Sequence, residues 1–306
     1  TNPMESHATA SIIVFYSLGL LVGLPLNVLS LWVLLCRHGL QSPNTVIMTN
    51  LAVSDLLLIL TMPFRIFFYA MSSWPFGDLA CKAAILVWRI NVMSSCFFIT
   101  FISIDRMLAL SYPLRSRTLR TPRLSWIACA VAWLIAVAHC LPEINCKKTS
   151  SNTCFNLSSQ DSFTRNSTNS PGQSARCHSP PLFVIILIVC LISLLVINLI
   201  STAAVIWTLH RRQSGLTGHS VRKIILLLAS CLFIFSFIFL PFVVTMLFSS
   251  LQEEPNLQAT EVTIAYASLN CCLDPIVYYL ALGAFWKKKE VADDQPNNVV
   301  LSYQIS

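Results

Sequence analysis

The sequence predicts an all-α membrane protein, a bundle of seven membrane-spanning helices followed by a short amphipathic eighth helix. Hydrophobic residues make up 55% of the 306 residues and charged residues only 11%, whereas soluble domains carry about 25% charged residues. Seven apolar stretches reach or approach the ~20 residues that a helix needs to cross a bilayer. These spans are expected near residues 12–36, 46–71, 83–110, 124–142, 181–209, 224–250 and 260–282.

The seven spans leave no room for a second globular domain. We therefore expect one transmembrane domain over residues 1–290 and a cytoplasmic tail over residues 291–306. The first apolar run is long and lacks a basic leader, which favours a spanning helix over a cleavable signal peptide. After Gly283, an apolar Phe-Trp pair precedes Lys287, Lys288 and Lys289. This pattern suits a short helix in the inner interface, with its lysines attracted to anionic membrane lipids.

The basic residues are distributed unevenly across the predicted membrane. With the N-terminus outside, 13 of the 20 Lys and Arg residues fall in the cytoplasmic loops and tail. Because positive charge concentrates on the cytoplasmic side of membrane proteins, we expect a multi-pass plasma-membrane protein with an extracellular N-terminus. The same basic residues are spread over loop ends with no stacking platform between them, which argues against nucleic-acid binding.

Four of the 12 cysteines face the predicted outside, and the other eight lie in spans, where they serve as small apolar packing residues. An oxidising exterior favours two disulfides among the four, with three connectivities open. Two N-glycosylation sequons, at Asn156 and Asn166, lie in the long polar loop 143–180. The four outer cysteines are Cys81, Cys146, Cys154 and Cys177.

Charged and polar residues or prolines interrupt six of the spans. A charge at bilayer depth costs roughly 2.5–3.5 kcal/mol on insertion scales, so such residues indicate function. Taken singly, each allows a packing interpretation: Arg106, for example, could snorkel at a helix end with Asp105 as its neutralising neighbour. Proline inside a helix frees a carbonyl and permits a kink. The set in chain order is Asn27, Asp55, Asp105-Arg106, Trp133, Phe235 with Phe239-Leu-Pro241, and Asn270 with Asp274-Pro275-Ile-Val-Tyr278.

In this order the residues resemble the rhodopsin-like (class A) G protein-coupled receptors over nearly the whole chain. Three further features look like the branch of the nucleotide, proteinase-activated and lysophosphatidic acid receptors: Trp74-Pro-Phe-Gly77 before Cys81, Asp274 in place of an Asn, and Phe239 in place of a Trp. The features that look most like lysophosphatidic acid receptors are Pro63-Phe-Arg65, Thr118-Leu-Arg-Thr121, and Asn198 with Thr208 in the fifth span.

The resemblance implies a receptor rather than an enzyme, with a heterotrimeric G protein and arrestin as partners. Arg106 would pair with Asp105 at rest and turn to the G protein when the sixth helix swings out. Phe235, Phe239, Pro241, Pro275 and Tyr278 would act as switch residues, with ordinary aromatic packing as the alternative for Phe239 and Tyr278.

The same resemblance implies a sodium pocket, and no other cofactor is expected. Its residues would be Asp55, Asn91, Ser95, Asn270 and Asp274, and an oxygen-rich set with carboxylates suits a hard cation. The alternative is a hydrated polar network without an ion. The resemblance also pairs Cys81 with Cys154, which leaves Cys146 and Cys177 for a bridge within the loop or as free thiols.

Arg65 and Arg89 lie at bilayer depth with no acidic residue near them in the sequence. We expect them to hold an anionic phosphate or carboxylate, because the planar guanidinium suits oxyanions. The alternative for Arg65 is snorkelling to the interface. Lys82 shares a helix face with Arg89, and His139 is a candidate pocket-lining residue. The outer parts of the sixth and seventh spans contain no Lys or Arg, which disfavours a triphosphate and favours a lysophospholipid or a fatty acid.

Several alternatives remain. Met107 follows Asp105-Arg106 where the family usually has Tyr or Phe, and an orphan receptor with high constitutive activity is compatible with that departure. A nucleotide or peptide receptor of the same branch is a second alternative. A transporter or channel would need related halves with paired helix breaks, and an intramembrane hydrolase would need a catalytic set such as H-E-x-x-H. The sequence has neither.

Overall fold

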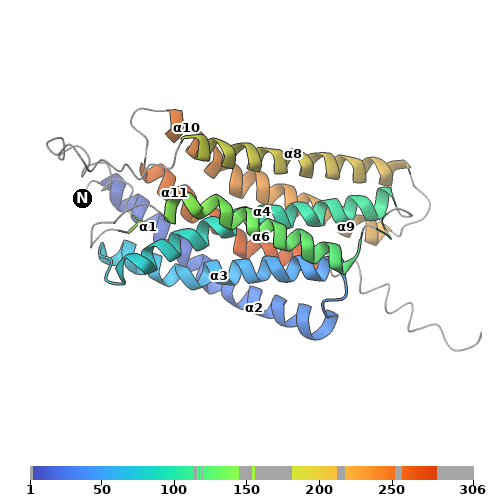
Figure 1. The fold of residues 1–306 in the computed structure, drawn as a ribbon, viewed down its shortest axis with the longest axis horizontal. Coiled ribbons are helices and arrows are strands. Elements are labelled where there is room, and N and C mark those ends of the chain that lie inside the picture. The colour runs from blue at the N-terminus through green and yellow to red at the C-terminus, as the bar shows by residue number, and fades with distance from the viewer. Residues whose placement is uncertain are drawn as a thin grey trace, which may run out of the picture.

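The computed structural model describes residues 3–112, 116, 118, 120–144, 154–155, 181–211, 218–251 and 257–280. Within these residues the chain is helical, and the helices run side by side along the long axis of the molecule (Figure 1). The expected eighth helix and the tail 291–306 lie outside the described residues.

The first and sixth spans each contain a wide π-helical turn that ends two residues before a proline. A proline lacks an N–H group, and its ring collides with the carbonyl four residues earlier in a regular helix. For Pro25 and Pro241 these carbonyls belong to Leu21 and Phe237, which both lie inside the wide turns. The first span comprises α1 (Pro3–Leu18), η1 (Gly19–Gly23), α2 (Leu24–Val33) and η2 (Leu34–His38), and the sixth comprises α9 (Gly218–Phe233), η3 (Ile234–Phe239) and α10 (Leu240–Leu251).

The second to fifth spans are continuous helices: α3 (Pro43–Met71), α4 (Gly77–Ser111), α6 (Pro122–Ile144) and α8 (Pro181–Arg211). Three of them begin at a proline, which is favourable in a first turn because the missing N–H group would have no helical partner there. The turn into α4 uses Gly77 at a φ of +80°, a conformation that other residues rarely adopt. The indole of Trp74 donates to the Gly77 carbonyl at 2.7 Å and fixes this turn.

The seventh span is broken in its middle. It comprises α11 (Leu257–Ala267) and a second helical segment over residues 270–280. At the break, the Leu269 N–H donates to the Tyr266 carbonyl and the Cys272 N–H donates to the Leu269 carbonyl, both at 3.0 Å. These tighter bonds between residues three apart replace the regular helical pattern. In the described part of the chain, six helices are long and apolar enough to cross a membrane, and this broken segment is the seventh.

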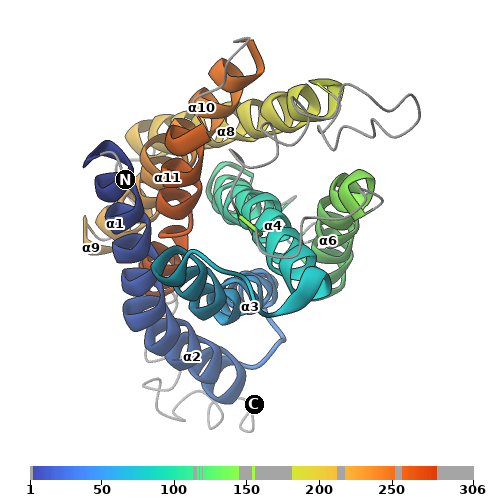
Figure 2. The same cartoon turned by 90° about the vertical axis from the view of Figure 1, so that its left-hand side faces the viewer.

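Helix α4 is the centre of the bundle. It packs against α3, α6, α8 and α9, and the end-on view places it between α3, α6, α8 and α11 (Figure 2). The core along it is largely apolar, whereas many apolar side chains on the outward faces of α2, α6 and α8 are exposed. A bundle with an apolar outside and a partly polar inside is suited to lipid surroundings. The all-α seven-helix fold predicted from the sequence is therefore confirmed.

The first and seventh spans are joined at a close approach. The Asn27 amide donates to the backbone carbonyl of Cys271 at 2.7 Å. One turn earlier, a Cβ atom added to Gly23 would lie 2.9 Å from the Cys271 sulfur, so a glycine is needed for the two helices to approach so closely. Between α3 and α6, the Trp133 indole donates to the Asn50 side-chain oxygen at 3.1 Å. These bonds fix the frame in which the polar clusters lie.

Candidate functional site

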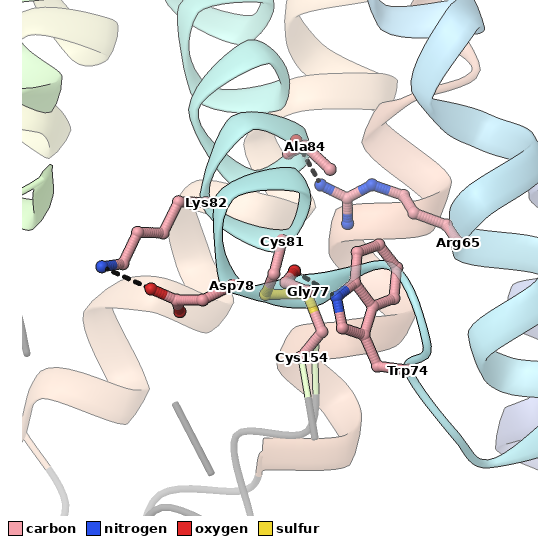
Figure 3. Close-up of a disulfide and its surroundings, with 8 residues drawn as sticks. All are labelled: Arg65, Trp74, Gly77, Asp78, Cys81, Lys82, Ala84 and Cys154. Carbon is pink, nitrogen blue, oxygen red and sulfur yellow. Dashed lines mark hydrogen bonds and ion pairs between the residues drawn. A yellow bond between two sulfur atoms is a disulfide. The ribbon is translucent and has the colours of Figure 1, made fainter. Parts of the chain in front are cut away.

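Arg65 is enclosed near one end of the bundle. Its residue exposure is only 3%, and its Nη2 atom donates to the Ala84 carbonyl of α4 at 3.1 Å (Figure 3). Its Nη1 atom donates to the Tyr16 hydroxyl of α1 at 3.3 Å. The guanidinium also lies over the rings of Phe155, at 4.4 Å, and Tyr16, at 5.6 Å. Arg65 is thus directed into the bundle and not toward a lipid interface.

No carboxylate in the described part of the chain forms an ion pair with Arg65. Its Nε atom is buried and has no hydrogen-bond partner there. Tyr69 stacks on Tyr16 at 6.5 Å between ring centroids. Among the described residues, a carbonyl, a hydroxyl and aromatic rings contact the Arg65 guanidinium, and a buried cation in such surroundings can accept an anionic group.

Phe155 is held in place by the disulfide that precedes it. Cys154 is bonded to Cys81 at the start of α4 (Figure 3), which confirms the predicted pairing. The Phe155 ring packs edge-to-face on Phe68, at 5.4 Å, and on Trp74, at 5.3 Å. The disulfide therefore positions an aromatic ring over the Arg65 guanidinium.

The other residues predicted to bind the ligand are placed differently. Lys82 forms an ion pair with Asp78 at 2.9 Å, and Figure 3 shows this pair on the side of α4 away from Arg65. Arg89 is half-buried on α4. Because a helix turns by about 100° per residue, Arg89 is rotated by roughly 140° from Ala84, the residue that Arg65 contacts. Arg89 therefore does not lie on the face of α4 that Arg65 of α3 contacts. His139 is half-buried on α6.

A second cluster, the Asp55 cluster, lies in the middle of the bundle. Asp55 has no solvent exposure. The Asn91 amide donates to the Asp55 carboxylate and to the Ser54 hydroxyl, both at 3.1 Å, and to the Ser95 hydroxyl at 3.3 Å. Ser54 in turn bonds Ser94 at 2.7 Å. Helices α3 and α4 thus meet here through side-chain hydrogen bonds.

The seventh span completes the Asp55 cluster. The Tyr278 hydroxyl donates to the Asp55 carboxylate at 3.4 Å, and the Asn270 amide donates to the Asp274 carboxylate at 3.4 Å. The side-chain oxygens of Asn91 and Asn270 and the Oδ1 atom of Asp274 are buried and have no hydrogen-bond partner among the described residues. All five residues of the predicted sodium set therefore lie in one polar cluster, in which three oxygen atoms can still accept a hydrogen bond.

Aromatic residues join α4 to the sixth and seventh spans. Trp88, one turn after Ala84 on α4, donates its indole N–H to the Ser268 hydroxyl at the break in the seventh span, at 3.0 Å. Its ring packs edge-to-face on Phe242, at 5.3 Å. Phe235 and Phe239 pack on each other at 5.9 Å within the wide turn η3. The predicted switch residues Phe235, Phe239 and Pro241 thus lie at the irregular part of the sixth span.

The third cluster lies at the other end of α4 and consists of Asp105, Arg106 and Arg120. Arg106 Nη2 donates to Asp105 at 2.9 Å, as the sequence predicts for a resting pair. Asp105 also accepts two bonds from Arg120, from Nε at 2.6 Å and from Nη2 at 2.9 Å. Asp105 is therefore shared between two guanidinium groups.

The sequence interpretation missed several of these contacts. It did not assign Phe155 or Tyr16 to Arg65, Trp88 to the seventh span, or Arg120 to Asp105. The position of Phe155 directly after the predicted disulfide cysteine was the one available signal. Pro275 lies in the helical segment 270–280. The predicted sites Cys146, Cys177, Asn156 and Asn166 lie outside the described residues.

Comparisons with known proteins agree with this architecture. The family described as 7 transmembrane receptor (rhodopsin family) matches residues 26–278. Lysophosphatidic acid receptor 6 of Mus musculus is 32% identical over 275 residues, covering 86% of this chain and 78% of the relative. Lysophosphatidic acid receptor 5 of Bos taurus is 34% identical, with 89% and 76% covered, and proteinase-activated receptor 4 of Homo sapiens is 34% identical, with 89% and 69% covered. The chain therefore belongs to the rhodopsin family of seven-transmembrane receptors, in the branch of the lysophosphatidic acid and proteinase-activated receptors, and is a multi-pass membrane receptor rather than an enzyme.

Proposed function

We propose that this receptor lies in the plasma membrane with its N-terminus outside, binds a small anionic lipid and activates heterotrimeric G proteins, with arrestin as a further partner. The observation that carries the ligand class is the enclosed Arg65. It is a buried cation without an ion-pair partner in the described residues, and its Nε atom can still donate. Isolated buried charges are strongly unfavourable, so a carboxylate or phosphate that approached Arg65 would gain an interaction that the described residues do not supply.

The surroundings of Arg65 favour a lipid over a nucleotide. Phe155 and Tyr16 lie against the Arg65 guanidinium, and Phe68 and Tyr69 pack on these two rings. Mostly apolar surroundings with one oriented polar anchor suit a ligand with one charged end and a long apolar part. Several relatives of the chain carry the name of lysophosphatidic acid, a ligand of that kind.

Arg89 would be a second contact for an extended ligand. It follows Trp88 on α4, and Trp88 lies one turn after the residue that Arg65 contacts. A ligand that lies across the Trp88 ring could therefore reach Arg65 of α3 and Arg89 of α4, although Arg89 is rotated away from the face of α4 that Arg65 contacts. A ligand bound there would alter the contacts of Trp88 with Ser268 and Phe242. It would thereby change which packing of the sixth and seventh spans is favoured.

A G protein activation panel tests the ligand class. Lysophosphatidic acid, oleate and nucleotides are compared on the wild type, Arg65→Ala, Arg65→Lys and Arg89→Ala at matched surface expression. Loss of charge-assisted bonds worth about 1.5–3 kcal/mol raises the half-maximal lysophosphatidic acid concentration roughly 10- to 100-fold in Arg65→Ala. Lys82→Ala is the matched control, because Lys82 is bonded to Asp78.

Two outcomes would contradict this ligand assignment. Strong signalling without any added ligand, unchanged in both arginine variants, would make the arginines structural and the receptor constitutively active. A response to a nucleotide that needs neither arginine would move the ligand to another part of the bundle.

We also propose that the Asp55 cluster holds a sodium ion. The three unpartnered oxygens, from Asn91, Asn270 and Asp274, together with the Asp55 carboxylate form a set of oxygen ligands that suits a hard cation. When bound, the ion would offset one of the two negative charges of the buried carboxylates and join α4 to the seventh span in the resting packing. A hydrated network without an ion is the alternative.

Thermal unfolding of the purified receptor separates the two interpretations. Replacing choline chloride by sodium chloride at constant ionic strength should raise the melting temperature of the wild type and not that of Asp55→Asn. Ser94→Ala is a control that removes a nearby hydroxyl and leaves both carboxylates. Equal melting temperatures of the wild type in both salts would favour the hydrated network.

A further inference from the structure

Arg120 contributes most of the hydrogen bonds that Asp105 accepts. Its Nε atom donates to Oδ1 at 2.6 Å and its Nη2 atom to Oδ2 at 2.9 Å, whereas Arg106 donates one bond to Oδ2, also at 2.9 Å. The Asp105 side chain is only 7% exposed, and that of Arg120 is 23% exposed. A bidentate arginine–carboxylate pair in partial burial is among the stronger ionic contacts in proteins.

Local structure on both sides fixes the position of Arg120. Its backbone N–H donates to the Ser116 carbonyl at 2.8 Å, which closes a helical turn after α4. The next residue, Thr121, accepts a bond from the Leu124 N–H at 3.3 Å and so caps the start of α6. Arg120 therefore stands at the junction between a short turn and α6, and its guanidinium is oriented before any partner binds.

This arrangement changes what happens when Arg106 leaves Asp105. With Arg106 as the only partner, its release would leave a buried carboxylate without a counter-charge, which is strongly unfavourable. With Arg120 in place, Asp105 keeps two of its three bonds after Arg106 has moved. We propose that Arg120 is a positioning residue that serves as the substitute partner of Asp105, and that it thereby favours the packing in which Arg106 is released.

A simpler interpretation of Arg120 predicts the opposite effect on ligand-independent G protein coupling. If Arg120 only fastened the loop to α4 in the resting packing, its removal would raise ligand-independent coupling. The proposal requires the reverse, so the sign of the effect decides between the two. The inference rests on G protein coupling and does not depend on the lipid ligand.

The test uses purified, ligand-free receptor and measures its apparent affinity for nucleotide-free G protein. The heterotrimer is the one that the wild type captures best from a panel of the four Gα classes. Arg120→Ala should weaken capture roughly 10-fold, which corresponds to about 1.4 kcal/mol, and Arg120→Lys should weaken it less because one charged donor remains. Arg123→Ala is the matched control, since Arg123 is an exposed arginine three residues later, in the first turn of α6. It should leave capture unchanged.

The Asp105→Asn background distinguishes this role from a direct contact between Arg120 and the G protein. Asp105→Asn alone should strengthen capture, and adding Arg120→Ala to it should have no further effect, because the carboxylate that Arg120 serves is gone. An equal weakening by Arg120→Ala in both backgrounds, or stronger capture by Arg120→Ala alone, would overturn the proposal. A wild type that captures no heterotrimer would instead overturn the proposed function.

Discussion

The contact between Arg65 and Phe155 gives the most direct test of how the surroundings of Arg65 are held together. Phe155→Leu keeps an apolar side chain of similar size at this position but removes the ring that lies 4.4 Å from the guanidinium carbon. Arg65 and Phe155 are only 3% and 7% exposed, so water screens the contact little. A desolvated cation–π contact is worth about 2 kcal/mol.

A double-mutant cycle isolates this contact from the packing of the ring on Phe68 and Trp74. The four proteins are the wild type, Phe155→Leu, Arg65→Met and the double variant, and the assay is the apparent melting temperature of purified, ligand-free receptor. A coupling of about 2 kcal/mol corresponds to roughly 4–8 °C in a domain of this size class. Phe155→Leu should therefore lower the melting temperature by several degrees more in the wild type than in the Arg65→Met background.

Phe155→Tyr is the matched control, because it keeps an aromatic ring over Arg65 and should melt close to the wild type. The reasoning would be refuted by a coupling below about 0.5 kcal/mol, that is, by Phe155→Leu lowering the melting temperature equally whether or not Arg65 is present. In that case the ring would stabilise the loop only by apolar packing, and the Arg65 charge would be balanced by other groups.

Three further variants test the frame around the clusters, each by the melting temperature of purified receptor. Asn27→Ala removes the 2.7 Å bond to the Cys271 carbonyl and should cost roughly 0.6–1.7 kcal/mol, the range of interhelical bonds in membranes; a melting temperature equal to the wild type would mean that water replaces the amide. Cys81→Ser opens a disulfide that joins residues 73 apart and should cost about 2–5 kcal/mol, and reductant should lower the melting temperature of the wild type by more than that of Cys81→Ser. Asn198→Leu removes the 2.8 Å bond between α8 and Thr100 of α4 and should destabilise by a similar amount to Asn27→Ala; an increase in stability would show that apolar packing outweighs the bond.

The sequence was sufficient to predict the fold because each span carries its own signal. The length and apolarity of a stretch determine whether it can cross a membrane, whatever its neighbours are. The same holds for residues that act within one helix, such as Asn91 and Ser95, which are four apart and lie in one cluster in the structure. The disulfide pairing came from the family resemblance, because spacing alone left three connectivities open.

The surroundings of Arg65 were harder to predict because the contacts there join segments far apart in the chain. Arg65 touches α1, α4 and the residue after Cys154, and no periodicity in the sequence relates these three places. The sequence does not show how Arg65 and Arg89 lie relative to one another, because the place where α3 meets α4 depends on packing and not on either helix alone. Lys82 was assigned by its spacing from Arg89, and the nearby Asp78, one turn earlier in the same helix, is its partner in the structure.

Helix α4 is the element that links the three clusters, and this determines how a ligand could act. Along its length it supplies Ala84 to Arg65, Trp88 to the seventh span, Asn91 to Asp55, and Asp105 to Arg106 and Arg120. The first three contacts join α4 to helices on its α3 and α11 side, whereas the last joins it to the loop before α6. With the proposed function, a ligand at Arg65 would not need to move α4 as a whole. Trp88 is already hydrogen-bonded to the broken seventh span, and Asn91 is already hydrogen-bonded to α3. A small change at these bonds would alter which packing of the sixth and seventh spans is favoured, and Arg120 would keep Asp105 satisfied in the packing that frees Arg106.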